Sequence, residues 1–259
     1  MGVVLAGGCR VSQMREGTPQ VNGTVSIWHQ IGRAMGAQAI SLRVLEFAPG
    51  LSPGISNSDC DDALYVFEAP DDQATIFIDG SSYHLTSDSG IYLKPGETLT
   101  VSNSGASPLG LLSSQCPEPE SESKFGSPLT SPLGGALQSQ QPPIVRLIDR
   151  KAVPTGDRWY RVLVDEEVGS MQVTQFVGSI PPGRAPDHFH NYEEVLFILR
   201  GTGRMWAAET NTLIGPGSCV YLPKGQVHCV ENTGIDELRL LGVFYPAGSP
   251  SVSYKGTKI

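Results

Sequence analysis

The chain has 259 residues, of which 39% are hydrophobic and 17% charged, and its formal net charge is −8. This length allows one large domain or two ordinary ones. The acidic balance, without a cluster of Lys or Arg, argues against nucleic acid and membrane surfaces as partners. The 30 glycines and 20 prolines, with few long periodic apolar runs, favour many short strands over helices.

The five cysteines are scattered and include no CxxC pair, which fits a reducing cytoplasm better than a disulfide framework. No apolar run is long enough to span a bilayer. The LAGGC stretch ending at Cys9 suggests a lipoprotein cleavage site, but we reject that interpretation because the basic region and a long apolar core are missing. Ala6 stands where a myristoylation signal has Ser or Thr. We therefore expect a cytoplasmic protein.

Residues 1–20 are expected to form a short strand and an exposed loop, and together an N-terminal tail. From residue 21 the chain consists of short runs rich in Val, Ile, Thr and aromatic residues, bounded by Gly, Pro, Asp or Asn. A first domain, residues 21–113, contains predicted strands at 24–31, 39–47, 63–69, 73–80, 82–85, 90–96 and 98–105. This spacing is typical of an all-β sandwich or barrel.

Composition changes in residues 114–143, where Ser, Pro, Gly, Gln and Glu dominate. Such a segment has too little apolar content for a core, so we expect an interdomain linker, with an ordered loop over a barrel as the alternative. A second domain, residues 144–247, contains predicted strands at 143–150, 158–165, 171–178, 194–201, 203–209, 219–223, 228–234 and 237–245. Residues 248–259 are polar and are expected to form a loose C-terminal tail.

The two predicted domains are related by an internal repeat. Residues 61–69 align with residues 193–201, and residues 92–105 align with residues 221–234 without a gap. The turn FAPG before the first alignment takes the place of IPPG in the second half. A repeat of this length indicates a duplicated domain rather than a solenoid module.

Three of the five histidines lie in the second copy and have the spacing of metal ligands. His188 and His190 are two residues apart, so on a strand they point to the same face. Glu194 follows His190 four residues later, and His228 adds a third imidazole from a later strand. Three imidazole nitrogens and one carboxylate oxygen suit a transition metal. A single histidine would more often fill a polar core, but the complete set favours a metal site.

These residues resemble the two signatures of the cupin superfamily, whose members are small jelly-roll β-barrels. The first signature matches, with a leading spacer one residue short, at Gly183, His188, His190, Glu194 and Gly201. The second matches without departure at Gly217, Pro223, Gly225, His228 and Asn232. Through the repeat, the resemblance extends to the first half and implies two tandem jelly-roll barrels, a bicupin.

The resemblance implies that His188, His190, Glu194 and His228 bind one divalent transition metal ion, which is Mn, Fe, Zn, Ni, Co or Cu. It implies no other cofactor.

The same alignment implies that the first barrel has lost its site. The positions of the four ligands are taken there by Ser56, Ser58, Asp62 and Leu99, and His84 lies elsewhere in the repeat. One carboxylate without imidazoles holds a transition metal poorly.

Other residues of the second barrel are weaker candidates. Arg204 and Tyr221 are the candidate catalytic residues, because a guanidinium near the metal would bind a carboxylate substrate through two hydrogen bonds. Further candidates for the cavity wall, with packing or surface roles as the alternative, are Tyr192, Trp206 and Gln226. Glu193 is expected on the solvated strand face, and Cys229 is expected to point away from the metal.

The resemblance implies a metal-dependent enzyme acting on a small polar, carboxylate or phenolic metabolite, with a dioxygenase-like or decarboxylase-like reaction. The alternative is a non-catalytic barrel that binds or stores a small molecule such as a sugar. Fold alone does not choose between them. A homodimer or higher homo-oligomer is also expected, because edge pairing in such barrels covers exposed strand edges.

Overall fold

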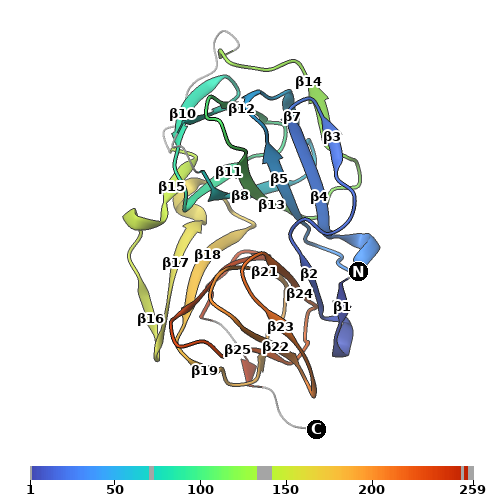
Figure 1. Ribbon diagram of the computed structural model, residues 1–259, viewed down its shortest axis with the longest axis vertical. Coiled ribbons are helices and arrows are strands. Elements are labelled where there is room, and N and C mark those ends of the chain that lie inside the picture. The colour runs from blue at the N-terminus through green and yellow to red at the C-terminus, as the bar shows by residue number, and fades with distance from the viewer. Residues whose placement is uncertain (1, 70–72, 133–141, 252–253, 256–259) are drawn as a thin grey trace.

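The computed structural model describes residues 2–69, 73–132, 142–251 and 254–255, and it contains two β-barrels stacked one above the other (Figure 1). Each barrel is built from one large and one small sheet, and its strand ladders are antiparallel. The predicted fold class, two tandem jelly-roll barrels, is confirmed.

The first barrel is formed mainly by residues before position 132. Its large sheet has the order β15 (Ile144–Arg146), β11 (Ser89–Leu93), β8 (Asp61–Glu68), β13 (Leu109–Cys116), β5 (Leu42–Phe47), β4 (Val25–Ile31) and β3 (Gln20–Asn22). Its small sheet has the order β10 (Ser81–Leu85), β9 (Ala74–Ile78), β12 (Thr98–Asn103), β7 (Gly54–Ser56) and β14 (Lys124–Gly126), with β6 (Gly50–Leu51) beside β12.

The second barrel repeats this plan. Its large sheet has the order β1 (Val3–Val4), β2 (Arg10–Gln13), β24 (Ser218–Leu222), β21 (Glu193–Arg200), β26 (Leu238–Tyr245), β18 (Thr174–Ile180), β17 (Arg158–Val164) and β16 (Val153–Thr155). Its small sheet has the order β23 (Thr210–Ile214), β22 (Gly203–Ala207), β25 (His228–Asn232), β20 (His188–Phe189) and β27 (Tyr254–Lys255), with β19 (Gly183–Arg184) beside β25.

The helical content of the described residues is limited to short 3₁₀ turns. These are η1 (Ala6–Gly8), η2 (Arg33–Met35), η3 (Leu147–Asp149) and η4 (Glu166–Val168). Across the described ranges, no helix has the length and apolar character needed to cross a membrane.

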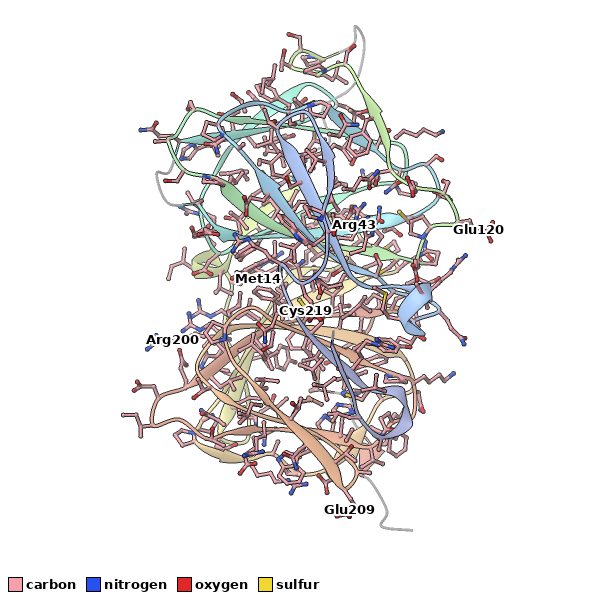
Figure 2. The ribbon with its side chains drawn as sticks, turned by 45° about the vertical axis from the view of Figure 1, so that its right-hand side comes forward. Met14, Arg43, Glu120, Arg200, Glu209 and Cys219 are labelled. Atoms are coloured by element: carbon pink, nitrogen blue, oxygen red, sulfur yellow. The ribbon has the colours of Figure 1, made fainter. Side chains whose placement is uncertain are left out.

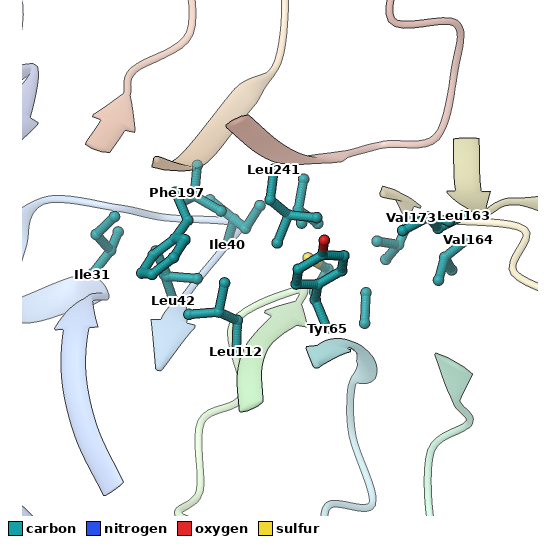
Figure 3. Packing of buried hydrophobic residues seen from close by; sticks show 14 of the residues in the cluster. Ile31, Ile40, Leu42, Tyr65, Leu112, Leu163, Val164, Val173, Phe197 and Leu241 are labelled. Atoms are coloured by element: carbon teal, nitrogen blue, oxygen red, sulfur yellow. The ribbon is translucent and has the colours of Figure 1, made fainter. Parts of the chain in front are cut away.

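The large sheets of the two barrels pack against each other and share one apolar core (Figure 3). Tyr65 and Leu112 of the first barrel meet Phe197 and Leu241 of the second in this layer. The large sheets are therefore buried on both faces, and β13 and β18 are buried along their whole length. This double burial explains why these strands are nearly continuous apolar or small-residue runs without alternation.

The small sheets face the barrel interior on one side only. β9 and β22 alternate between buried and partly exposed residues, as a sheet with one covered face requires. Their inward side chains, such as Ile76 in the first barrel and Met205 in the second, are fully buried in two separate interior cores.

The N-terminal segment pairs with the distant second barrel. β2 lies antiparallel to β24, with Arg10 opposite Tyr221, and β1 pairs with β2. Residues 1–20 were expected to form a tail, but this segment extends the large sheet of the second barrel (Figure 1). The ordering is explained by Leu5, Cys9 and Val11, which are buried in the second barrel's core.

A chain lacking residues 2–13 is expected to lose about 4 kcal/mol or more of stability in the second barrel, because full burial of one aliphatic side chain contributes about 1.5–3 kcal/mol. Limited proteolysis with mass mapping should then show new cleavage within residues 144–247. The half-exposed Val3 provides a matched control, and Val3→Ser should leave the cleavage pattern unchanged. An unchanged pattern for the deletion would contradict this assignment of the segment.

The other connecting segments are also partly ordered. Within the predicted linker, β14 pairs with β7 of the first barrel, and the Leu129 amide donates to Thr100 Oγ1 at 3.0 Å. Residues 114–116 are the end of β13, and residues 117–132 follow the alternative, an ordered loop over a barrel. Residues 133–141 lie outside the described residues. Within the predicted C-terminal tail, β27 pairs with β20. The exact division of the chain into two domains stays a prediction.

Candidate metal centre

The structure brings three imidazoles together where two short strands meet. β20 pairs with β25 so that His188 lies directly opposite His228, and His190 follows just after β20. Directly opposed residues in an antiparallel pair place their side chains in contact. The nitrogens that these histidines offer as ligands lie within 4.8 Å of one another, which is a suitable arrangement for one metal ion.

Backbone carbonyls orient two of the three rings. Nδ1 of His188 lies 2.9 Å from the Pro186 carbonyl, and Nδ1 of His228 lies 2.8 Å from the Gln226 carbonyl. A carbonyl accepts only, so Nδ1 carries the proton in both rings, and Nε2 keeps its lone pair for a metal. Such outer hydrogen bonds are the usual way in which proteins fix metal-ligating histidines.

The third ring is held by aromatic packing. The ring of Tyr192 stacks on His190 with centroids 4.8 Å apart, and its other side stacks on Phe244 at 4.4 Å. Tyr192, a candidate for the cavity wall, thus supports His190 from behind.

Burial keeps the imidazoles in the form that binds metals. Burial, together with the neighbouring His188, lowers the pKa of His228 to about 3. The pKa of His188 is also lowered, first by burial and then by the positive charge of Arg158. Both rings are therefore neutral near pH 7, as metal ligation requires.

Glu194 lies beside the histidines in a buried position. Its Oε2 atom is 3.4 Å from Nε2 of His190, and the residue is 4% exposed. Burial raises the pKa of its carboxyl to about 8, because the charged form is poorly solvated there. A bound cation would offset this cost, so the donor set fits a metal ion. The assignment of the four residues as ligands stays a prediction.

The histidine cluster opens into a cavity of about 360 Å³ inside the second barrel. The polar groups at the metal end are followed by an apolar wall that includes Tyr160, Phe176, Ile180, Leu196 and Leu240. This volume exceeds what a metal ion and its water molecules need and lies in the range of small-molecule sites.

Arg158 is a charged side chain of the cavity wall that the sequence interpretation missed. It lies on β17, lines the cavity together with Tyr160, and is close enough to His188 to lower that ring's pKa. Among the described residues its buried Nε atom has no hydrogen-bond partner, and its Nε lies 3.7 Å from Asp157. Alternation along RWYRVLV was the available signal, since it places Arg158 and Tyr160 on the same face of the strand.

The two residues that the sequence suggested for catalysis lie outside this cavity. Arg204 is on the outer face of β22, where its Nη1 donates to Asn211 Oδ1 at 2.7 Å. Tyr221 belongs to the apolar layer between the barrels. Trp206 is also on the outer face of β22, where it donates to Glu231 and lies under the Arg184 guanidinium. Cys229 lies opposite Trp206 on that face, as expected.

The expectation that Glu193 is solvated was wrong. Its carboxylate accepts hydrogen bonds from the amides of Gln38 at 3.0 Å and Ala39 at 2.7 Å and from the Tyr221 hydroxyl at 2.7 Å. Alternation correctly placed Glu193 on the outer face of β21. That face is covered by the first barrel, so it is buried instead of solvated.

Comparison with known proteins agrees with this geometry. Residues 176–244 match the Cupin domain family. The chain superposes on oxalate decarboxylase from Bacillus subtilis with a TM-score of 0.72 and 14% identity, over 91% of this chain and 76% of the enzyme. A mutant of that enzyme gives a TM-score of 0.73 at 14% identity, covering 95% of this chain and 78% of the other.

The second barrel thus contains a Cupin domain, and the first barrel repeats its fold, so we call the two-barrel arrangement a bicupin fold. A shorter match, 32% identical over 84 residues, relates the chain to auxin-binding protein 1 of Arabidopsis thaliana, covering 28% of this chain. The chain spans 42% of the length of that relative.

The first barrel of this bicupin has an ion pair where the second has the histidine cluster. Asp62, at the position of Glu194, accepts from Arg43 at 3.0 Å and from Ser113 at 2.6 Å. The cavity there is only about 20 Å³. Within the described ranges, the one group of three or more potential metal ligands is His188, His190 and His228.

Proposed function

We propose that this bicupin is a metal-dependent, decarboxylase-like enzyme acting on a small carboxylic acid with an apolar or aromatic body. The observation that carries the proposal is Arg158, a guanidinium whose buried Nε has no hydrogen-bond partner among the described residues, in the same cavity as the three imidazoles. The similarity in fold to oxalate decarboxylase supports a lyase, while the volume and apolar wall favour an acid larger than oxalate.

His188, His190 and His228, with Glu194, would hold the ion, and a divalent metal would supply a Lewis acid that polarises substrate oxygens. Arg158 would bind a carboxylate of the acid and fix its orientation, since guanidinium and carboxylate form paired hydrogen bonds. The apolar wall around Phe176 and Leu196 would exclude water and hold the body of the acid.

The experiment that tests this proposal is a turnover screen of the metal-loaded protein with oxalate and a series of larger aliphatic and aromatic acids. Release of carbon dioxide without consumption of oxygen would support the lyase. Consumption of oxygen would instead support a dioxygenase-like reaction on a phenolic acid. Binding of an acid without any turnover would support the second candidate function, a non-catalytic ligand-binding barrel.

Replacing Arg158 by Gln is expected to raise KM for the preferred acid about 10- to 100-fold, because a charge-assisted hydrogen bond contributes about 1.5–3 kcal/mol. Steady-state kinetics would measure this change. Arg161→Gln is a matched control, since Arg161 lies on the opposite face of the same strand and donates to the Leu147 carbonyl. Equal effects of the two substitutions would argue against a substrate contact by Arg158.

A second candidate is a non-catalytic ligand-binding barrel, favoured by the local similarity to auxin-binding protein 1. In that case His190→Ala would weaken binding of an acid but remove no turnover. A homo-oligomeric state and a cytoplasmic location also stay predictions. The location is supported by the five cysteines, all of which are free and buried.

A further inference from the structure

A second cavity lies at the junction of the two barrels, outside the metal centre. Its volume is about 370 Å³, and we call it the junction cavity. It is lined by residues of the N-terminal segment, of the η2 turn and of the second barrel, including Gly7, Arg10, Gly36, Glu193, Tyr221 and Lys224. The walls therefore come from both barrels.

Arg10 is the side chain that points to a ligand. Because Arg10 lies opposite Tyr221 in the β2–β24 ladder, both side chains are on the face toward the first barrel. The Nε atom of Arg10 is buried and has no hydrogen-bond partner within the described part of the chain. Buried charged donors rarely lack a partner in folded proteins, so an acceptor from outside the chain fits this position.

The charges around the junction cavity favour an anion. Glu193 is its buried carboxylate, and the hydrogen bonds from Gln38, Ala39 and Tyr221 already compensate it. Arg10 and Lys224 then provide positive charge without a carboxylate within salt-bridge distance among the described residues. We propose that the junction cavity binds a small molecule through an oxyanion group, either a carboxylate or a phosphate.

Titration calorimetry and thermal unfolding of the full chain, freed of metal by a chelator, would test this site with inorganic phosphate and malonate as probes. We expect saturable binding of at least one probe and a rise in Tm, since a ligand bound only to the folded state stabilises it. The probe that binds more tightly assigns the group as phosphate or carboxylate.

Arg10→Gln is expected to lower the affinity at least about 10-fold through loss of a charge-assisted hydrogen bond. The exposed Lys224 supplies a second variant, and Lys224→Gln should weaken binding without affecting the fold. Lys151→Gln removes an exposed charge outside the cavity and should have no effect. Absence of binding by both probes, or loss of binding with Arg158→Gln but not with Arg10→Gln or Lys224→Gln, would overturn the proposal.

Discussion

Replacing His190 by alanine is expected to reduce bound divalent metal from about one ion per chain to nearly none. Loss of an outer hydrogen bond to a ligand already costs about 10- to 100-fold in metal affinity, so loss of a ligand itself should cost at least about 100-fold. Elemental analysis after dialysis would measure the stoichiometry. Metal at 100 times its Kd should also stabilise the unsubstituted protein by about 2.7 kcal/mol, an effect that His190→Ala should abolish.

The first barrel supplies the matched control for this experiment. Ser58 occupies the position of His190 in the repeat and is exposed. Ser58→Ala should leave metal content and metal-dependent stabilisation unchanged. A His190→Ala protein that keeps its full complement of metal would contradict the proposed centre.

Replacing Arg43 by alanine is expected to lower the free energy of unfolding by about 3–5 kcal/mol. Arg43 is buried in the first barrel, where its Nη2 lies 3.0 Å from Asp62 (Figure 2). Burial raises the pKa of Asp62, whereas Arg43 lowers it, so the guanidinium favours the charged carboxylate. Removal of Arg43 would leave an uncompensated buried carboxylate, and denaturation by urea would measure the loss.

Two further variants separate this pair from an ordinary surface contact. Arg146→Ala breaks a pair whose side chains are 57% and 53% exposed, and its cost should not exceed about 1 kcal/mol. Combining Arg43→Met with Asp62→Leu should recover much of the lost stability, because apolar groups of similar volume replace buried ion pairs well. A loss below about 1 kcal/mol for Arg43→Ala would disprove the importance of the pair.

The repeat identifies the residues that differ between the ion pair of the first barrel and the corresponding region of the second. Arg43 corresponds to Phe176, which lines the cavity of the second barrel, and Ser113 corresponds to Gly242. A Cβ atom at Gly242 would lie 2.4 Å from the Phe176 ring, so the second barrel needs glycine there. The first barrel has instead a hydroxyl, which binds both members of its ion pair.

The sequence by itself determined the features that depend on local spacing. Alternation and turn residues predicted the strands, and the repeat predicted two barrels. The spacing of His188, His190 and His228 predicted that the three side chains lie close together. These predictions succeeded because strand periodicity and the shared barrel plan place such residues with little dependence on the rest of the chain.

Only the tertiary structure decided what covers each strand face. Glu193 and Tyr221 are on the outward face of their strands, as alternation requires, but that face is buried against the first barrel. Arg158 lines the cavity because β17 forms part of the wall of the second barrel. Residues 10–13 form a strand because they pair with the edge of β24. Contacts between residues far apart in the chain determine these outcomes, and local alternation gives only the face of a strand, not what that face contacts.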